Sequence, residues 1–332
     1  MKFGFSKLVG SFLLGLIMVS GCSRANRQPS KAQSTSQSSQ KLASSSKHAK
    51  PAQVKPKATS KTNLNQRNIR SVEKKCLTAA SGQTSIYVDS LNTKQPVIMN
   101  NRSQRSASVI KLFIMVEAFR QIKAGRLALN QEVSIPQADR VGGTGELAHQ
   151  SVRQLSVSRL LTLMIRNSDN SATNVLIDRL GGLTVINQEI KRLGCTQTRL
   201  QRKMLDYQAL KNGKDNMTSV KDVGSLLSRL YQHRVLGDPY DTKMLQLLRY
   251  NANQSKLPAL INQKATIFNK TGEFPDYGVQ NDAAILLKRA IKHLSSWFFL
   301  KRVFKVGKLT QCNSLAVNYI RLFSLQNSQL KF

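Results

Sequence analysis

Residues 109–119 form the apolar segment that most limits how this chain can fold. The apolar side chains fall on nearly every side of a helix: Val109, Ile110, Leu112, Phe113, Ile114, Met115, Val116 and Phe119. A helix that is apolar on all sides has to be buried. The rest of the chain must therefore build layers of structure around it. Lys111 is the one basic residue in its first turns, and apolar packing gives no reason for a lysine there.

Strand signals lie on both sides of a helical region. Residues 85–88 and 97–99 flank one turn, and residues 266–269 and 283–287 flank another that contains Gly and Pro. Four helices are expected between them. One begins at Ser151, which opens a Ser-x-x-Gln capping box, and the others cover residues 171–180, 184–193 and 219 to about 231. This order predicts an α+β fold, with an antiparallel sheet built from both termini, flanking helices and an all-helical subdomain.

Two irregular segments interrupt this pattern. Residues 195–217 are polar and long enough to predict a functional loop of the Ω type. Residues 142–145 read Gly-Gly-Thr-Gly but lack the Lys-Ser/Thr that follows a phosphate-binding loop. We expect them to form the rim of a cleft.

The first 22 residues have the parts of an export signal. Two lysines are followed by an apolar run over residues 8–19 and by Ser-Gly ahead of Cys22. This end resembles the lipobox of bacterial lipoproteins, in which the cysteine sulfur receives a lipid. The resemblance implies an exported protein, lipid-anchored at Cys22 to the outer face of the bacterial plasma membrane.

Charge is distributed unevenly over the chain. The formal net charge is +34. Residues 23–75 carry 13 basic residues and one acidic residue, and residues 288–332 carry nine basic and no acidic residues. The first of these segments has no aromatic residue and predicts a disordered tether, which would strengthen binding to an anionic membrane. A basic stripe interleaved with aromatic residues is missing, which argues against nucleic acid as a partner.

The four cysteines, Cys22, Cys76, Cys195 and Cys312, do not form a disulfide framework. A single Cys76–Cys195 bridge stays open as an alternative to isolated buried thiols, which we prefer. No paired Cys/His spacing indicates a metal site, and we expect neither metal nor cofactor.

Ser108 and Lys111 form the first chemical motif. Their spacing of three puts both side chains on one helix face. A serine hydroxyl needs a neighbouring base to become a nucleophile, and a lysine in an apolar setting can be that base because burial lowers its pKa. The serine also begins its helix, where free backbone N–H groups stabilise negative charge.

Two further motifs follow in order, Ser-Asp-Asn at 168–170 and Lys-Thr-Gly at 270–272. With Ser108-x-x-Lys111 they resemble the class A β-lactamase and penicillin-binding serine hydrolase family. The resemblance runs from about Ser85 to Leu286, and it implies a catalytic domain over residues 76–287 that forms an acyl-enzyme.

The resemblance also implies a role for each motif residue. Ser108 would be the nucleophile, Lys111 its general base and Ser168 the proton relay, with Asn170, Lys270, Thr271 and Gly272 binding substrate. The oxyanion hole would be the backbone N–H groups of Ser108 and Glu273.

Two features depart from the family. Met204 stands where the family has the glutamate that activates the deacylating water, and a thioether is not a base. Asp206 is a candidate substitute, and Gln208 could hold a water or the loop. Residues 288–332 resemble nothing in the family, so the expected C-terminal strand and helix are in doubt and the segment is assigned as a divergent basic tail.

The sequence thus predicts a monomeric serine hydrolase that is acylated by β-lactams and hydrolyses them, with slow deacylation. A D-alanyl-D-alanine peptidase acting on wall peptides needs the same acylation residues. A non-catalytic penicillin sensor is the alternative outside the enzymes.

Overall fold

The computed structural model describes residues 83–90, 95–260, 265–288 and 294–302, together with Arg67, Arg70 and Ser71. The chain divides into a unit of residues 1–56 and a unit of residues 57–332, and all the described residues lie in the second unit. The expected signal segment, Cys22 and Cys76 therefore lie outside the described residues. Among the described helices, none has both the length and the apolar character that crossing a membrane requires.

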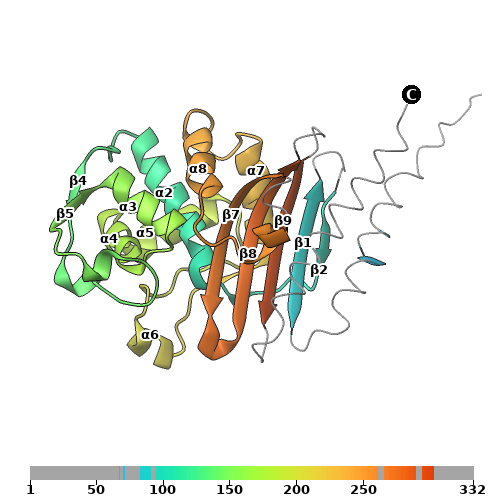
Figure 1. Cartoon of the computed structure of the whole chain (residues 1–332), viewed down its shortest axis with the longest axis horizontal. Coiled ribbons are helices and arrows are strands. Elements are labelled where there is room, and N and C mark those ends of the chain that lie inside the picture. The colour runs from blue at the N-terminus through green and yellow to red at the C-terminus, as the bar shows by residue number, and fades with distance from the viewer. Residues whose placement is uncertain are drawn as a thin grey trace, which may run out of the picture. The chain divides into compact units, whose positions relative to one another are not determined.

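A five-stranded antiparallel sheet is built from the two ends of the described chain (Figure 1). Its strands are β1 (Thr84–Ser90), β2 (Val97–Met99), β7 (Ala265–Phe274), β8 (Val279–Lys288) and β9 (Leu294–Arg302). Their order across the sheet is β2-β1-β9-β8-β7. This arrangement confirms the α+β fold and the strand pairs that the sequence predicts.

Strand β9 comes from the segment that the sequence assigns to a divergent tail. It lies between β1 and β8, pairing Val88 with Trp297 on one side and Ala284 with Trp297 on the other. The C-terminal strand that the sequence left in doubt is thus present and joins the two halves of the sheet. Residues after Arg302, where the family would have a helix, lie outside the described part.

The helices pack beside the sheet in two groups (Figure 1). Their bounds are η1 (Ala107–Ile110), α2 (Lys111–Lys123), α3 (Val157–Arg166), α4 (Asn170–Arg179), α5 (Gly182–Arg192), α6 (Tyr207–Lys211), α7 (Val220–Tyr231) and α8 (Tyr240–Arg249). In Figure 1, α3, α4 and α5 gather away from the sheet, whereas α7 and α8 lie near it. The short strands β4 (Glu132–Ser134) and β5 (Gln154–Ser156) lie with the first group, so the subdomain that the sequence predicts is mainly rather than wholly helical. Helix α7 is capped by Ser219, whose hydroxyl accepts from Asp222 N at 3.2 Å, as the sequence predicts.

Helix α2 is the centre of the core. Its apolar residues from Leu112 to Phe119 are at most 1% exposed, and it contacts α3, α4, α5 and α8. The expectation of a helix buried on all sides is confirmed. Lys111, at the start of this helix, is also fully buried.

The expected capping box at Ser151 is wrong. Gln154–Ser156 form strand β5, which pairs with β4 (Glu132–Ser134), and α3 starts only at Val157. Ser156 is the true cap and accepts from Arg159 N at 3.3 Å. A strand forms here instead of a helix because its hydrogen bonds with β4 satisfy backbone groups that the first turn of a helix would leave unpaired.

Cys195 is buried and its thiol is free. Burial raises its pKa to about 12, so the thiol stays protonated and unreactive. This agrees with the preferred assignment of buried thiols, while Cys76 lies outside the described residues.

Candidate active site

A cleft of about 470 Å³ collects most of the predicted site residues. Its walls include Ser108, Ser168, Asn170, Thr271, Gly272 and Glu273. Lys111 and Lys270, the two lysines of the predicted motifs, are fully buried beside these residues and reach them with their amino groups. The three motifs, which are far apart in the sequence, therefore meet at one place.

Ser108 sits in the short helix η1, immediately before α2. Ala107, just ahead of it, has φ of +44°, a left-handed conformation that costs energy for a residue with a side chain. The turn is tied down because Ser106 donates its backbone N–H to Asn216 O at 2.8 Å. This hydrogen bond helps to keep the strained turn in place, with Ser108 at the wall of the cleft and at the start of the helix.

Gly272 allows strand β7 to lie directly against this turn. A Cβ at Gly272 would be only 3.0 Å from Ser106 O and from the backbone nitrogens of Ser108 and Val109. The resemblance implied a substrate-binding role for Gly272; in the structure this glycine lets strand β7 approach the backbone of residues 106–109 closely. Ser108 and Glu273, the two residues expected to supply the oxyanion hole, both line the same cleft.

The Lys111 amine makes three polar contacts. Its Nζ lies 2.6 Å from Ser168 O, 3.0 Å from Asn170 Oδ1 and 3.3 Å from Ser168 Oγ. Helix α2 brings this amine to the junction of α3 and α4, where Ser168 takes a positive φ of 56°. The buried lysine that apolar packing did not explain is thus held by the second motif.

Ser168 Oγ lies between two amines. Lys270 Nζ is 3.1 Å from it on one side, and Lys111 Nζ is 3.3 Å from it on the other. Lys270 also donates to Thr271 O at 2.7 Å. A hydroxyl placed this way can accept a proton from one amine while giving its own to a neighbour.

Burial lowers the pKa of both lysines. For Lys111 the loss of solvent is the main cause, and the charge of Lys270 adds to it, so its pKa falls well below 10.5 although Asp169 opposes the shift. For Lys270 burial lowers the pKa to about 7, with Lys256 adding and Asp282 opposing. Lys111 is therefore suited to be a base, and Lys270 loses its charge near neutral pH.

Asp169 holds the rim of the cleft. Its carboxylate accepts from Glu146 N, Leu147 N and Ala172 N, each at 2.8 Å. The Gly-rich segment 142–145 approaches so closely that a Cβ on Gly145 would collide with Asp169 at 2.2 Å. Gly143 and Thr144 line the cleft, which confirms the expected rim loop.

Met204 lines the cleft on the loop of residues 195–217. Its side chain is 7% exposed, and Asn174 holds its backbone, accepting from Met204 N at 2.8 Å and donating to Met204 O at 3.2 Å. Next to it, Lys203 bridges Asp139 at 2.7 Å and Asp178 at 2.6 Å. The structure therefore keeps Met204 at the wall of the cleft that Ser108 also lines.

Asp206, unlike Met204, does not line the cleft. It is exposed, is absent from the cleft walls, and accepts from Ala209 N at 2.9 Å as the cap of α6. Gln208, on the same short helix, is also exposed. The structure thus brings together every other predicted catalytic and substrate-binding residue but leaves the candidate deacylation base outside the cleft.

The four histidines of the chain offer an alternative Ser-His-Asp scheme for a serine nucleophile, but the described part of the chain gives it no support. His149 and His233 do not line the cleft, and His233 instead contacts Asp238 at 2.9 Å. His48 and His293 lie outside the described residues.

Three residues that support the site were missed by sequence reasoning: Asp169, Asn174 and Lys256. Lys256 is 3% exposed and binds Asn281 O at 3.1 Å and Glu273 Oε1 at 3.0 Å, beside strand β7. Asp169 could have been found, because it lies within the Ser-Asp-Asn motif. The other two carry no local signal.

Comparisons with known proteins find relatives in sequence and in fold. A β-lactamase of Streptomyces albus G is 30% identical over 166 residues, 48% of this chain and 52% of that protein. The solved structure of PBP-A has a TM-score of 0.69 at 24% identity, covering 80% of this chain and 97% of that one. A PBP-A mutant described as an acyl-enzyme complex with penicillin G has a TM-score of 0.70 at 24% identity, with the same coverage of both chains.

The structural likeness establishes the fold, and the sequence match spans only about half the length of the Streptomyces protein. The model of a family described as the beta-lactamase enzyme family matches residues 66–301, which is well over half of the chain and includes all three motifs and all of β9 except Arg302. The chain therefore belongs to the beta-lactamase enzyme family.

Proposed function

We propose that this chain is a serine hydrolase that is acylated by β-lactams at Ser108 and releases the product slowly. The observation that carries the proposal is the position of Lys111 Nζ, buried within hydrogen-bonding distance of Ser168 and Asn170 at the cleft that Ser108 lines. The PBP-A mutant described as a penicillin G acyl-enzyme supports the same chemistry in a structural relative.

Acylation follows from the pKa of the lysine. Neutral Lys111 takes the proton of Ser108, whose Oγ attacks the lactam carbonyl, and the N–H groups of Ser108 and Glu273 stabilise the resulting oxyanion. The C–N bond then breaks, and the ring nitrogen receives a proton from the Ser168 hydroxyl, which is refilled from Lys111. Lys270 and Thr271 bind the substrate carboxylate.

Deacylation lacks a base at the place where the family has one. Met204 cannot take a proton from water, and its buried thioether makes that wall of the cleft apolar. The ester should therefore persist. This feature favours a second candidate, a D-alanyl-D-alanine peptidase acting on wall peptides, for which β-lactams are trapping inhibitors. A non-catalytic penicillin sensor is the third.

Steady-state kinetics with a chromogenic cephalosporin separate these candidates. Continuous turnover supports the β-lactamase, and a burst of one equivalent supports the peptidase or the sensor. Release of D-alanine from a wall peptide then identifies the peptidase. If no reaction occurs at all, the acyl-enzyme proposal is wrong.

We also propose that the protein is exported and anchored through a lipid on Cys22, with the basic segment 23–75 strengthening its hold on an anionic membrane. Cys22→Ser should release the protein into the medium, whereas the parent should partition into detergent. Equal partitioning of the two proteins contradicts the anchor.

The first catalytic prediction concerns the nucleophile and its base. Ser108→Ala should abolish covalent labelling by a fluorescent penicillin, because no acyl acceptor remains. Lys111→Ala should slow labelling by about 10²–10⁴-fold, the usual contribution of a positioned proton acceptor. Thermal unfolding checks that both variants are folded, and undiminished labelling of folded Ser108→Ala would rule out the assignment.

The second concerns pH. Since burial lowers the pKa of Lys270 to about 7, the ammonium that attracts the substrate carboxylate is lost as pH rises through that value. The second-order rate of labelling by a penicillin should then fall, by at most about tenfold per pH unit. A penicillin methyl ester, which has no carboxylate, is the matched control and should not show this decline. Identical profiles for the two compounds would contradict the role of Lys270.

The third concerns deacylation. Met204→Glu should raise steady-state hydrolysis, because it places a carboxylate at a position that Asn174 already holds beside the ester. Met204→Gln is the matched control, similar in size to glutamate but not a base, and should leave turnover unchanged. Asp206→Asn tests the substitute base. If it cuts turnover while the penicillin burst remains, Asp206 reaches the water by a loop movement.

A further inference from the structure

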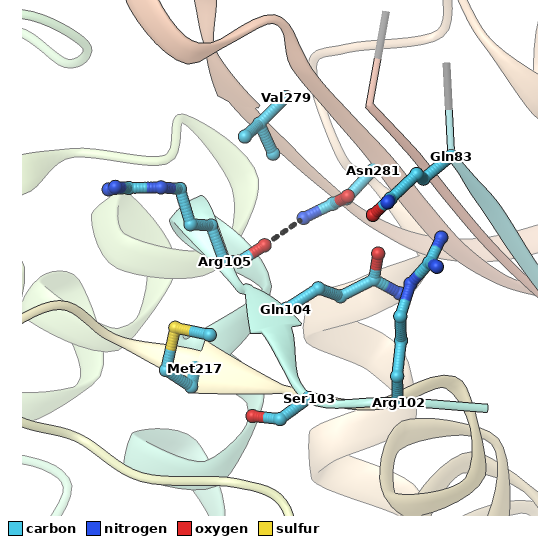
Figure 2. A pocket seen from close by; sticks show the side chains of 8 residues that line it. All are labelled: Gln83, Arg102, Ser103, Gln104, Arg105, Met217, Val279 and Asn281. Carbon is cyan, nitrogen blue, oxygen red and sulfur yellow. Dashed lines mark hydrogen bonds between the residues drawn. The ribbon is translucent and has the colours of Figure 1, made fainter.

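A second cavity of about 180 Å³ lies beside the segment that leads into the nucleophile turn (Figure 2). Its walls come from Gln83 ahead of β1, from residues 102–105 around β3 (Gln104–Arg105), and from Val279 and Asn281 of β8. It shares no lining residue with the catalytic cleft. The volume is below the roughly 300–1,000 Å³ of pockets for drug-sized ligands, so any occupant is small.

Arg102 brings an uncompensated charge to this cavity. Within the described chain it forms no ion pair, and no carboxylate lines the cavity. The neighbouring Arg105 is different, because its guanidinium is paired with Asp215 and stacks 3.8 Å above the ring of Tyr277. Arg102 is therefore the cation that remains available for a ligand.

Gln104 adds an unsatisfied donor. Its Nε2 is buried, yet among the described residues it has no hydrogen-bond partner. A buried amide without a partner costs free energy, and each such group in a native protein calls for an explanation. In Figure 2 the side chains of Arg102, Gln104 and Gln83 extend toward the same part of the cavity. A ligand with acceptor oxygens would satisfy both the amide and the charge.

We propose that this cavity binds a small oxyanion, either a phosphate or a carboxylate group. The planar guanidinium of Arg102 can hold two oxygens at once, and the Gln104 amide can donate to one of them. Gln83, an exposed residue of the lining, supplies a further amide. Among the lining residues that the structure describes, one unpaired cation with amides beside it suits a group with one or two negative charges.

One wall of this cavity is hydrogen-bonded to the turn that carries Ser108. Asn281, one of its walls, donates from Nδ2 to Arg105 O at 3.1 Å and to Ser106 O at 2.9 Å. Ser106 O also accepts from Val109 N at 3.2 Å, within the turn that carries Ser108. The bound anion therefore lies next to a side chain that holds the backbone before the proposed nucleophile.

Titration calorimetry at constant ionic strength tests the proposal with two probes, inorganic phosphate and N-acetyl-D-alanine. At least one should bind saturably to the full chain. Arg102→Gln should weaken that binding roughly tenfold or more, as expected for loss of a charged hydrogen-bonding partner. Arg126→Gln, the same change at an exposed arginine elsewhere, is the control and should leave affinity unchanged. Which probe binds tells phosphate from carboxylate.

Gln104→Leu gives a second readout that a structural role would not produce. Removing a buried amide that has no partner should raise the unfolding temperature of the free protein. The further rise in unfolding temperature that the bound probe gives the parent protein should be absent in this variant. Loss of stability in the free variant would show that Gln104 is paired within the protein, which contradicts the site.

Lys270→Ala separates this cavity from the catalytic cleft, where a carboxylate is also expected to bind. If Lys270→Ala still binds the probe, the second site is supported. If Lys270→Ala loses probe binding while Arg102→Gln keeps it in full, the proposal is overturned. The proposal is also overturned if Arg126→Gln weakens probe binding as much as Arg102→Gln does, or if neither probe binds saturably. None of these measurements uses acylation, so they stand even if Ser108 proves unreactive.

Discussion

The buried amine of Lys111 is the interaction on which the arrangement of the cleft depends. An amine so far from water needs polar partners, and here Ser168 and Asn170 supply them. Those contacts join α2 to the junction of α3 and α4. Because the nearby Lys270 also loses solvent, two amines and one hydroxyl share a small polar space within an apolar core. Packing and proton chemistry are therefore set by the same contacts.

The sequence predicted the fold, and its motifs named residues that the structure brings to one cleft, because both leave local signals. Short motifs fix Ser108, Lys111 and Lys270, and strand patterns at the two ends predict the sheet. The start of α3 was mispredicted because pairing of β5 with β4 overrode a plausible capping box at Ser151. Tertiary pairing between distant segments cannot be read from a few neighbouring residues.

The supporting contacts were harder to foresee for the same reason. Asn174 and Met204 are 30 residues apart, yet their two reciprocal hydrogen bonds determine where the loop places its side chain. Lys256 reaches the β7–β8 pair through backbone oxygens, which give no pattern in the sequence. The assignment of Met204 came from a departure from the family pattern, and the structure adds that the loop still presents this position to the cleft.

The order of strands has a consequence for how the chain is assembled. Strand β1 is synthesised early, but its neighbour β9 is among the last described parts of the chain to be made. Until β9 arrives, one edge of β1 and one edge of β8 have no partner, and exposed strand edges are templates for aggregation. Pairings so distant in sequence also form slowly. A premature stop ahead of Leu294 would thus remove the strand that joins the two halves of the sheet, leaving every motif residue present on a protein prone to self-association.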